Sequence, residues 1–186
     1  MQAPRLVTER LIIEKLKLQD YQKMYSYRSH PEVTRYQVWK PSGEEDVKQF
    51  IHKMGKNGFN IEDSWFQIGI YLKSNQELIG DIGLHFLPPD NMQTEIGFTI
   101  DPAHQHKGFA TEAVIAAIDY LFNTLHKHRI TGSVDPKNAA SIALLVTIGM
   151  RKEALFKQSV WIDGCWEDDV IYAVLNDEWK ELRNIG

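Results

Sequence analysis

With 186 residues, of which 43% are hydrophobic and 25% are charged, the sequence has the length and composition of one ordinary globular domain, which excludes a disordered or fibrous chain. The formal net charge of -4 argues against nucleic-acid binding, because a face that neutralises phosphates must be basic. Cys165 is the single cysteine, so neither an intramolecular disulfide nor a thiolate-rich zinc site can form. We find no apolar run suited to export or to a membrane span, and therefore expect a cytoplasmic protein with no membrane partner.

The first part of the chain predicts one strand followed by two helices. Leucine and isoleucine mixed with charged residues over 10–16 favour a strand. Asp20 begins a segment with helical spacing of its apolar and aromatic residues, and Pro31 closes it. A second helix is predicted over 44–56, where acidic residues suit the positive end of the dipole and the Ser42 hydroxyl can accept from an unpaired backbone N–H.

The middle of the chain predicts three consecutive strands, over 65–72, 77–86 and 94–100. The segment 73–76 between the first two has a length suited to a hairpin turn. Asp101-Pro102 stops the third strand, because proline cannot donate to a ladder.

The last part of the chain predicts two buried helices among three strands. Over 108–125, apolar residues recur along one face of a long helix. The second helix, 138–149, ends at Gly149. We expect the strands over 128–134, 150–160 and 167–174, the last two joined in a hairpin through Asp163-Gly164.

The segment from Gln105 to Thr111 lies between the third strand of the middle region and the long helix. Backbone N–H groups at such a helix start lack partners, and with the dipole behind them they form a site for a pyrophosphate. Gly108 lets the backbone approach a phosphate, Ala110 is small enough for the same purpose, and Lys107 can add positive charge at the mouth. A plain helix start that carries a glycine is the alternative interpretation, whereas a nucleotide-hydrolysing loop is excluded because it requires Gly-x-x-x-x-Gly-Lys-Ser/Thr.

This segment resembles a known family. Gln105-x-x-Gly108-x-Ala110 is similar to the coenzyme A pyrophosphate motif of the GNAT family of N-acetyltransferases. Resemblance to the branch that acetylates the N-termini of ribosomal proteins is carried by Thr8-Glu9-Arg10-Leu11, Glu95-Ile96-Gly97-Phe98, Asn138-x-x-Ser141, Ile148-Gly149-Met150, and the tail Asp163-Gly164-Cys165-Trp166-Glu167-Asp168 with Tyr172. The resemblance implies one N-acetyltransferase domain over 1–186, of the α/β (α+β) class. Its sheet would be mixed and mainly antiparallel, with about seven strands splayed at the cofactor cleft and about four flanking helices.

The resemblance also implies a cofactor and its binding residues. Acetyl-CoA would be the co-substrate, with its pantetheine arm paired like an added strand to backbone groups of Phe98, Thr99 and Ile100. The pyrophosphate would lie on Gln105, His106, Lys107, Gly108, Phe109, Ala110 and Thr111. Asn138 would hydrogen-bond the pantetheine region, and Ser141 would lie near the sulfur. The alternatives are that the strand residues are plain core and that Asn138 and Ser141 are helix caps.

Acetyl transfer needs a proton acceptor, because an amine with a pKa near about 10 is protonated at neutral pH. Glu95 is the first candidate base, and the alternative is a strand-face carboxylate paired with a surface lysine. His85 is the second candidate, since an imidazole titrates near about 6.5. The resemblance implies a backbone N–H in the Thr99 region for the developing oxyanion and Ser141 as donor to the leaving thiolate. Family members that have a tyrosine in the helix after the asparagine differ from this chain, which has Leu145 there.

Other residues offer weaker signals. The pairs His104-x-His106 and His126-x-His128 lack a nearby ligand set, so we expect no metal. Cys165 has no activating base in view, so we expect no acyl-enzyme. Aromatic residues that would line an acceptor pocket, although aromatic side chains more often belong to a core, are Tyr36, Trp39 and Trp65.

The sequence therefore predicts an acyl-CoA-dependent N-acetyltransferase in which a primary amine attacks acetyl-CoA directly in a ternary complex. The acceptor would be a protein N-terminus or a small-molecule amine, and the family implies that a homodimer is possible. The alternative is a non-catalytic acyl-CoA-binding sensor, which would keep the pyrophosphate loop and lose its proton-transfer groups. Glu95 and Ser141 are both present, which favours the enzyme.

Overall fold

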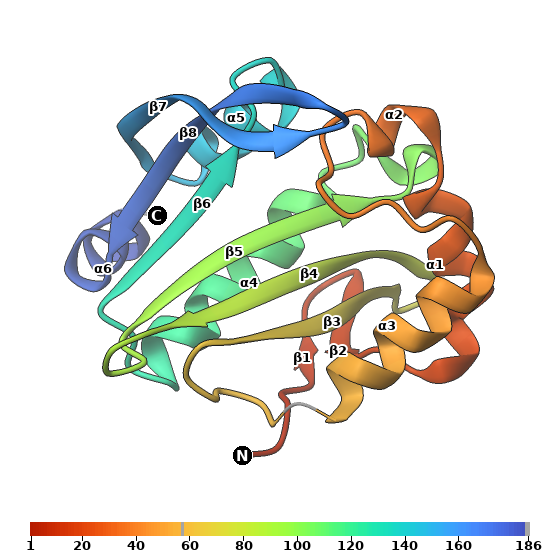
Figure 1. Cartoon of the computed structure of the whole chain (residues 1–186). Helices are drawn as coiled ribbons and strands as arrows, with labels where there is room; N and C mark the ends of the chain where they lie inside the picture. Colours follow the sequence, from red (N-terminus) through yellow and green to blue (C-terminus); the bar gives the residue numbers. More distant parts are fainter. Residues whose placement is uncertain (57, 185–186) are drawn as a thin grey trace.

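One sheet with helices packed on it forms the framework of the protein (Figure 1). The computed structural model describes residues 1–56 and 58–184. The strands of this part of the chain are β1 (Leu6–Val7), β2 (Leu11–Lys15), β3 (Ser64–Leu72), β4 (Leu78–Leu87), β5 (Gln93–Ile100), β6 (Arg129–Val134), β7 (Arg151–Ile162) and β8 (Cys165–Leu175). The helices are α1 (Tyr21–Arg28), α2 (Pro31–Thr34), α3 (Glu44–Lys56), α4 (Phe109–Asn123), α5 (Ala139–Thr147) and α6 (Asn176–Asn184). None of these described helices combines the length and the apolar composition that crossing a membrane requires.

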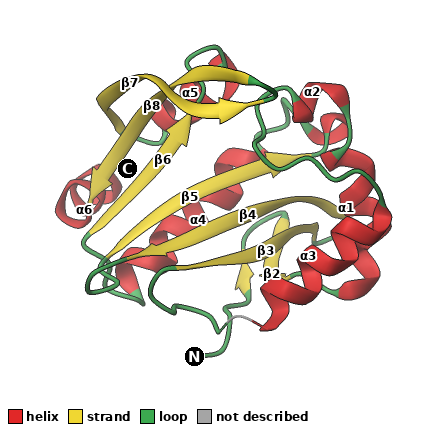
Figure 2. Cartoon of the chain, in the orientation of Figure 1, coloured by secondary structure: helices red, strands yellow, loops and turns green. Residues whose placement is uncertain are grey.

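The sheet is mixed and mainly antiparallel, as predicted. Its strands follow the order β1-β2-β3-β4-β5-β6-β8-β7, and only β5 and β6 are parallel neighbours among the described strands. β5 and β6 pair over Gln93–Glu95 and Arg129–Thr131 and then diverge, which Figure 2 shows in the upper half of the sheet. The predicted splay of the sheet is confirmed at this point.

The two faces of the sheet carry separate apolar clusters, because side chains alternate along a strand. Ile12 and Ile13 are neighbours in β2 and belong to different clusters. The larger cluster packs against the apolar stripe of α4, which consists of Ala113, Val114, Ala117, Ile118, Leu121 and Phe122. The smaller cluster holds α1 and α3 against the other face through Met24, Tyr27, Val47 and Ile51. Full burial of one large aliphatic or aromatic side chain contributes about 1.5–3 kcal/mol, so these clusters fix the sheet that presents the cleft.

Most predicted elements are confirmed to within a few residues. Helix α3 has the predicted bounds. The hairpin between β7 and β8 turns at Asp163 and Gly164, whose φ angles of 49° and 82° are left-handed and suit the Asp-Gly pair. Gly149, with a φ of 94°, follows the end of α5 as predicted.

Three further elements, β1, α2 and α6, are not predicted by the sequence. They give eight strands and six helices in the described residues, compared with the predicted seven and four. Tertiary contacts hold α6 in place: Trp179 is 1% exposed, and its Nε1 donates to Asp119 of α4 at 2.7 Å. The local signals that could have indicated this helix are the acidic residues Asp177 and Glu178 in its first turn and Arg183 in its last.

Two local predictions are wrong. The Ser42 hydroxyl donates to the Asp46 carboxylate instead of accepting from the backbone, and the Ser42 N–H donates to the same oxygen at 2.8 Å. The carboxylate in the first turn therefore caps the segment before α3. Helix α5 was expected to be buried, but within it only Leu145 is buried. Ile142 and Leu144 are partly buried against the larger cluster, and other side chains of α5 face solvent or the cleft described next.

Candidate active site

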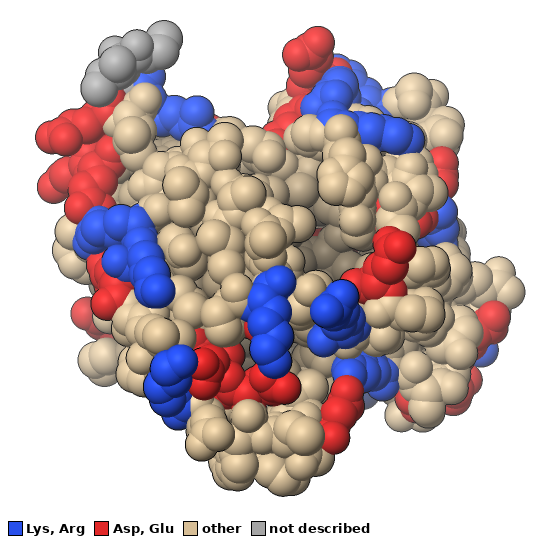
Figure 3. Space-filling model, turned by 90° about the horizontal axis from the view of Figure 1, so that it is seen from above, with Lys and Arg blue, Asp and Glu red and all other residues tan. Residues whose placement is uncertain are grey.

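A cleft opens where β5 and β6 part. It consists of two cavities of about 350 Å³ and about 390 Å³. We name the first the acidic cavity, because Glu95, Asp135 and Asp169 line it, and the second the loop cavity, because the segment before α4 lines it. The cavities are adjacent, and share the lining residues Tyr36, Gln37, Phe98, Thr99, Asn138 and Ser141. Figure 3 looks down on this side of the molecule and shows a hollow between its two halves.

The start of α4 forms one end of the loop cavity. Gly108 is the N-cap of α4 and has a φ of 78°, a left-handed conformation that glycine adopts without steric cost. His106 is also left-handed, with a φ of 59°. The residues that follow Gly108 and line the cavity are Phe109, Ala110 and Thr111. Their N–H groups belong to the first turn, where a helix offers no partner, so the helix start can bind an anion.

The other predicted loop residues divide into two kinds. Gln105 and His106 line the cavity, and Gln105 Nε2 donates to the carbonyl of Ile100 at 3.1 Å. Lys107 does not line the cavity, because its side chain folds back and Nζ donates to the carbonyl of Ala103 at 2.8 Å. The positive charge that the sequence predicts at the mouth therefore lies against the outside of the loop.

Strand β5 presents a free edge to the cleft. In an antiparallel pair, residues that exchange both backbone hydrogen bonds alternate with residues that exchange none. The Asp101 N–H donates to the carbonyl of Ile79 at 2.8 Å, so by this alternation Thr99 also bonds to β4. Phe98 and Ile100 then direct their N–H and C=O groups to the open edge, which agrees with the bond from the loop to the Ile100 carbonyl. Within the predicted Thr99 region, the available backbone donors are therefore the N–H groups of Phe98 and Ile100 and not that of Thr99.

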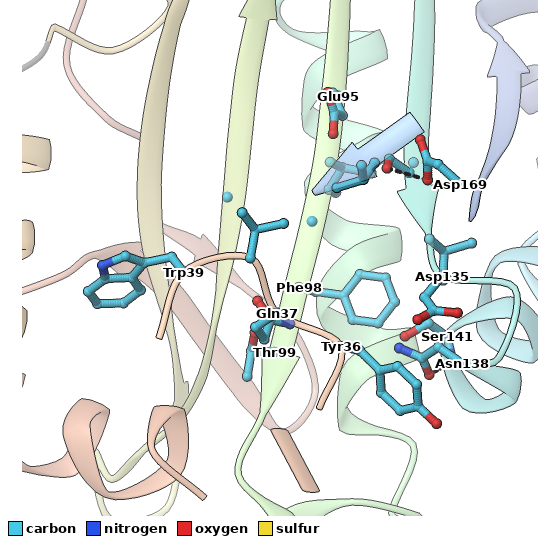
Figure 4. Close-up of a pocket in the computed structure, with 18 of the residues that line it drawn as sticks. Tyr36, Gln37, Trp39, Glu95, Phe98, Thr99, Asp135, Asn138, Ser141 and Asp169 are labelled. Carbon is cyan, nitrogen blue, oxygen red and sulfur yellow. Dashed lines mark hydrogen bonds between the residues drawn. The ribbon is translucent and has the colours of Figure 1, made fainter. Parts of the chain in front are cut away.

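Helix α5 forms the opposite wall. Asn138 is its N-cap, and Oδ1 accepts from the Ser141 N–H at 3.2 Å, so the capping interpretation is confirmed for Asn138, whereas Ser141 supplies the N–H that is capped. Both residues also line both cavities, and Figure 4 shows them close together beside Phe98. In the described part of the chain, neither Asn138 Nδ2 nor the Ser141 hydroxyl has a hydrogen-bond partner. Capping thus leaves each residue one polar group for a ligand.

The segment between α2 and α3 crosses the cleft. Tyr36 Oη donates to the carbonyl of Lys137 at 3.2 Å, and Lys40 forms an ion pair with Asp163 in the turn between β7 and β8. Figure 1 shows this segment passing from the helices α1 and α3 to the side of the sheet that carries β7. Tyr36 and Trp39 line the acidic cavity, as the sequence predicts for the aromatic residues. The segment therefore covers the acidic cavity with aromatic side chains.

Glu95 lies at the point where the pairing of β5 and β6 ends. It lines the acidic cavity, and burial raises the pKa of its carboxyl, an effect that the positive field of His85 opposes and Asp169 reinforces. His85 faces it from β4, with 3.8 Å between His85 Nδ1 and Glu95 Oε2, and stacks on Trp65 with 4.7 Å between the ring centroids. His85 does not line either cavity, so it reaches the cleft through Glu95.

A buried ion pair forms the floor of the acidic cavity, and the sequence analysis did not find it. Asp81 is 0% exposed and accepts from Tyr27, Arg28 and Gln67. Arg28 also donates from Nη1 to Gln37 Oε1 at 3.2 Å, which ties the floor to the covering segment. An aspartate inside an apolar strand run is the signal that could have indicated a buried partner.

Carboxylates from β8 and from the loop after β6 were also missed. The acidic side chains that line the acidic cavity are Glu95, Asp135, Glu167, Asp168 and Asp169. Glu167 and Asp168 are paired with Lys137 and Lys157, each at 2.7 Å. Among the described lining residues, Arg28 is the one lysine or arginine, and its charge is balanced by the floor aspartate. This cavity therefore favours a cationic ligand.

Sequence comparison identifies the fold that carries this cleft. A model of the acetyltransferase (GNAT) domain matches residues 10–151. The chain belongs to the GNAT acetyltransferase family. The matched region contains β5, the start of α4 and α5, which are the elements that form the cleft. Acetyl transfer is thus the chemistry of the family to which the chain belongs.

Individual GNAT relatives agree with this membership. The uncharacterized N-acetyltransferase YnaD of Bacillus subtilis (strain 168) is 33% identical over 94% of this chain and 99% of its own length. The ribosomal protein uS5-alanine N-acetyltransferase of Escherichia coli (strain K12) is 29% identical over 96% of this chain and 94% of its own length. A solved structure of a GNAT acetyltransferase from Bacillus anthracis matches with a TM-score of 0.84 and 30% identity, and the match covers 94% of this chain and 99% of that one. The predicted similarity to the branch that includes ribosomal-protein acetyltransferases is confirmed.

Proposed function

We propose that this protein transfers the acetyl group of acetyl-CoA to a primary amine by direct attack in a ternary complex. One observation carries the proposal: an anion site at the start of α4 and an acidic cavity lie side by side and share lining residues, with the open edge of β5 between them. A polyanionic donor with a long polar arm and a cationic acceptor would meet where the two cavities share residues. Residues 1–186 would act as one acetyltransferase domain, because β8 and α6 complete the sheet and its packing.

The loop cavity has the groups that coenzyme A requires. The N–H groups after Gly108 would hold the pyrophosphate, and Gly108 supplies the left-handed φ from which the helix starts. The amides of the pantetheine arm would pair with the N–H and C=O groups of Phe98 and Ile100, as a peptide adds to a sheet edge. Asn138 Nδ2 would bind the same arm from the opposite wall. When bound, acetyl-CoA supplies an activated thioester.

The residues around the shared part of the cleft can serve each step of the reaction. The amine nitrogen attacks the thioester carbon, the carbonyl oxygen gains negative charge, and the C–S bond then breaks. Glu95 would accept the proton that the amine loses, directly or through water. The Phe98 N–H would bind the oxygen as its charge develops, and the Ser141 hydroxyl would donate a hydrogen bond to the departing sulfur. CoA would leave as a thiolate and take its proton from solvent, which receives the proton that Glu95 releases. His85 would act on the charge of Glu95 and not on the amine.

Direct attack is favoured over an acyl-enzyme because of where the candidate nucleophiles lie and what they contact. Cys165 is exposed in the turn region of the β7–β8 hairpin and does not line either cavity. Ser141 lines both cavities, but among the described residues no carboxylate or imidazole accepts a hydrogen bond from its hydroxyl. A nucleophilic serine or cysteine needs such a base.

Two classes of acceptor fit the acidic cavity. The relative from Escherichia coli is named for an alanine of ribosomal protein uS5, so we propose a peptide N-terminus as the first class. A small-molecule amine is the second, because the cavity of about 350 Å³ can enclose one. Both carry the positive charge that the unpaired carboxylates favour.

The test is release of CoA thiol from acetyl-CoA in the presence of N-terminal peptides, polyamines, aminoglycosides and amino acids. We expect release with at least one acceptor class, and expect Glu95→Gln to slow the reaction by about 100-fold or more while CoA affinity stays within about twofold. Glu45→Gln, on the exposed side of α3, is the matched control and should react at the wild-type rate. CoA binding without acetylation of any acceptor would favour the acyl-CoA-binding sensor instead. An unchanged rate in Glu95→Gln would remove this carboxylate from the mechanism.

A further inference from the structure

The Thr8-Glu9-Arg10 motif lies directly behind the loop that starts α4, although about a hundred residues separate them in the sequence. The Arg10 N–H and the Thr8 hydroxyl donate to Glu112 Oε1 at 2.9 Å and 2.6 Å. Arg10 Nε donates to Glu112 Oε2 at 2.6 Å, and Arg10 Nη1 donates to the carbonyl of Lys107 at 2.9 Å. The guanidinium also lies over the ring of Phe109, 4.5 Å from its centroid. Thus one arginine contacts the loop, its first helical residue and the first turn of the helix.

The bond from Arg10 to the Lys107 carbonyl orients the next backbone donor. In a trans peptide the C=O and the following N–H point in opposite directions. Because the Lys107 carbonyl is held on the outside by Arg10, the N–H of Gly108 is turned away from Arg10. Gly108 lines the loop cavity, whereas Thr8, Arg10 and Glu112 do not. The contact therefore lies behind the loop and fixes the direction of a group in front of it.

Arg10 also balances a negative charge at the anion site. Glu112 lies in the first turn of α4, where a carboxylate stabilises the helix but repels a phosphate bound to the same end. Burial by itself would raise the pKa of Glu112, but hydrogen bonds from Thr8 and Arg10 outweigh it and lower the pKa, so the carboxyl is ionised. Both of its oxygens are occupied by Thr8 and Arg10. The ion pair cancels the charge that would otherwise oppose the ligand.

We propose that Arg10, held by Glu112 and Thr8, is a positioning residue for the pyrophosphate loop. It sets the direction of the Gly108 N–H and neutralises Glu112 without touching the ligand. The proposal rests on the proposed function, because it assumes that the loop cavity takes the pyrophosphate of coenzyme A. It predicts that loss of Arg10 weakens binding of the part of the ligand that carries phosphate and leaves binding of the phosphate-free part unchanged.

The experiment compares two ligands on two variants. Dissociation constants of CoA, by titration calorimetry, and of pantetheine, by competition with acetyl-CoA, are measured for wild type, Arg10→Met and Arg5→Met. Arg5 forms a similar exposed ion pair with Glu14 at 3.0 Å, away from the loop, and is the matched control. We expect Arg10→Met to raise the dissociation constant of CoA by about tenfold or more, the equivalent of one charge-assisted hydrogen bond. Its dissociation constant for pantetheine, and both constants of Arg5→Met, should stay within about twofold of wild type.

Arg10→Lys keeps the proposal open to refutation if Arg10→Met does not fold, and a double variant tests the charge argument separately. Arg10→Lys retains the charge but not the forked geometry, and should give an intermediate CoA affinity. In a Glu112→Gln background, the loss of CoA affinity caused by Arg10→Met should be several-fold smaller than in the wild-type background, because the charge to be neutralised is gone. Equal weakening of CoA and pantetheine, or CoA affinity within twofold of wild type in Arg10→Met, would overturn the proposal. If wild type binds no CoA, the proposed function fails first, and that result is distinct from a wild type that binds CoA and a variant that binds it equally well.

Discussion

Asp81→Asn is expected to destabilise the protein strongly, because asparagine cannot satisfy the donors around this position. Oδ2 of Asp81 accepts from Tyr27 and, at 3.1 Å, from Arg28 Nε, while Oδ1 accepts from Arg28 Nη2 and from Gln67. Asparagine has nearly the same shape but one acceptor oxygen, so its NH2 group must face an Arg28 donor whichever way the amide is turned. Arg28 is 7% exposed and would also lose its counter-charge.

The size of the effect follows from this burial. Removing one partner of a buried ion pair costs about 3–5 kcal/mol. For a chain of this length, each kcal/mol corresponds to roughly 2–4 °C in Tm, so the midpoint should fall by roughly 6–20 °C. The free energy of unfolding is measured by urea denaturation followed by circular dichroism, with a thermal scan as a second measurement.

An exposed ion pair provides the control for this measurement. Lys180 and Asp177 are 3.5 Å apart on α6, with the side chain of Asp177 93% exposed. Lys180→Met should change the free energy of unfolding by no more than about 0.5 kcal/mol. If Asp81→Asn loses less than about 1 kcal/mol with an unchanged denaturant slope, the pair does not hold the floor of the acidic cavity in the way described.

Three further predictions concern titratable side chains. Lys127, which is 2% exposed, donates to three oxygen acceptors, so Lys127→Met should destabilise the protein by about 2–4 kcal/mol in urea. Burial lowers the pKa of Lys127 to about 8, below its unfolded value, so the unfolded chain binds this proton more tightly. The proton-linked part of its stability contribution is therefore lost as pH falls from the unfolded pKa to about 8. The stability advantage of wild type over Lys127→Met should accordingly grow from pH 7 to pH 10, and a constant difference would contradict this. Burial raises the pKa of Glu95, so the acid limb of the kcat/KM profile should lie at a pH above the ordinary glutamate pKa. His85 opposes that rise, so the limb should move to higher pH in His85→Gln. A limb that stays in place would show that His85 does not act on the charge of Glu95. Asp169 accepts from the Ser133 hydroxyl at 2.7 Å, and Asp169→Asn removes its charge while keeping its size. The variant should raise KM several-fold for acceptors with two positive charges and less for acceptors with one. Equal changes in KM would argue against charge selection.

The parts of the fold that the sequence predicted depend on local patterns. The apolar stripe of α4 repeats with helical period over 15 residues, and Asp163-Gly164 is a strong turn signal because both residues tolerate a left-handed φ. The loop before α4 was predicted for the same reason, since a glycine just before a helical pattern is a signal contained in a few neighbouring residues. Gln105 and Gly108 of this loop line the cleft, as predicted.

The parts that the sequence did not predict depend on partners and on strand register that composition and spacing do not reveal. Asp81 acquires its role from Arg28, which comes from a helix on a different segment. Lys107 was expected at the mouth, but the nearby carbonyl of Ala103 binds its ammonium group. Which backbone donors are free, those of Phe98 and Ile100 and not that of Thr99, depends on the register between β4 and β5. A shift of one residue reverses which edge a backbone group faces, and the composition of the strand does not reveal it.

The most direct test of the account is a crystal structure of the protein with CoA bound. The account predicts the pyrophosphate on the N–H groups that follow Gly108, the pantetheine arm along the open edge of β5, and the sulfur between Phe98 and Ser141 at the mouth of the acidic cavity. CoA bound elsewhere on the surface, or a sulfur that does not reach the side of Glu95, would contradict the claim that this cleft brings donor and acceptor together.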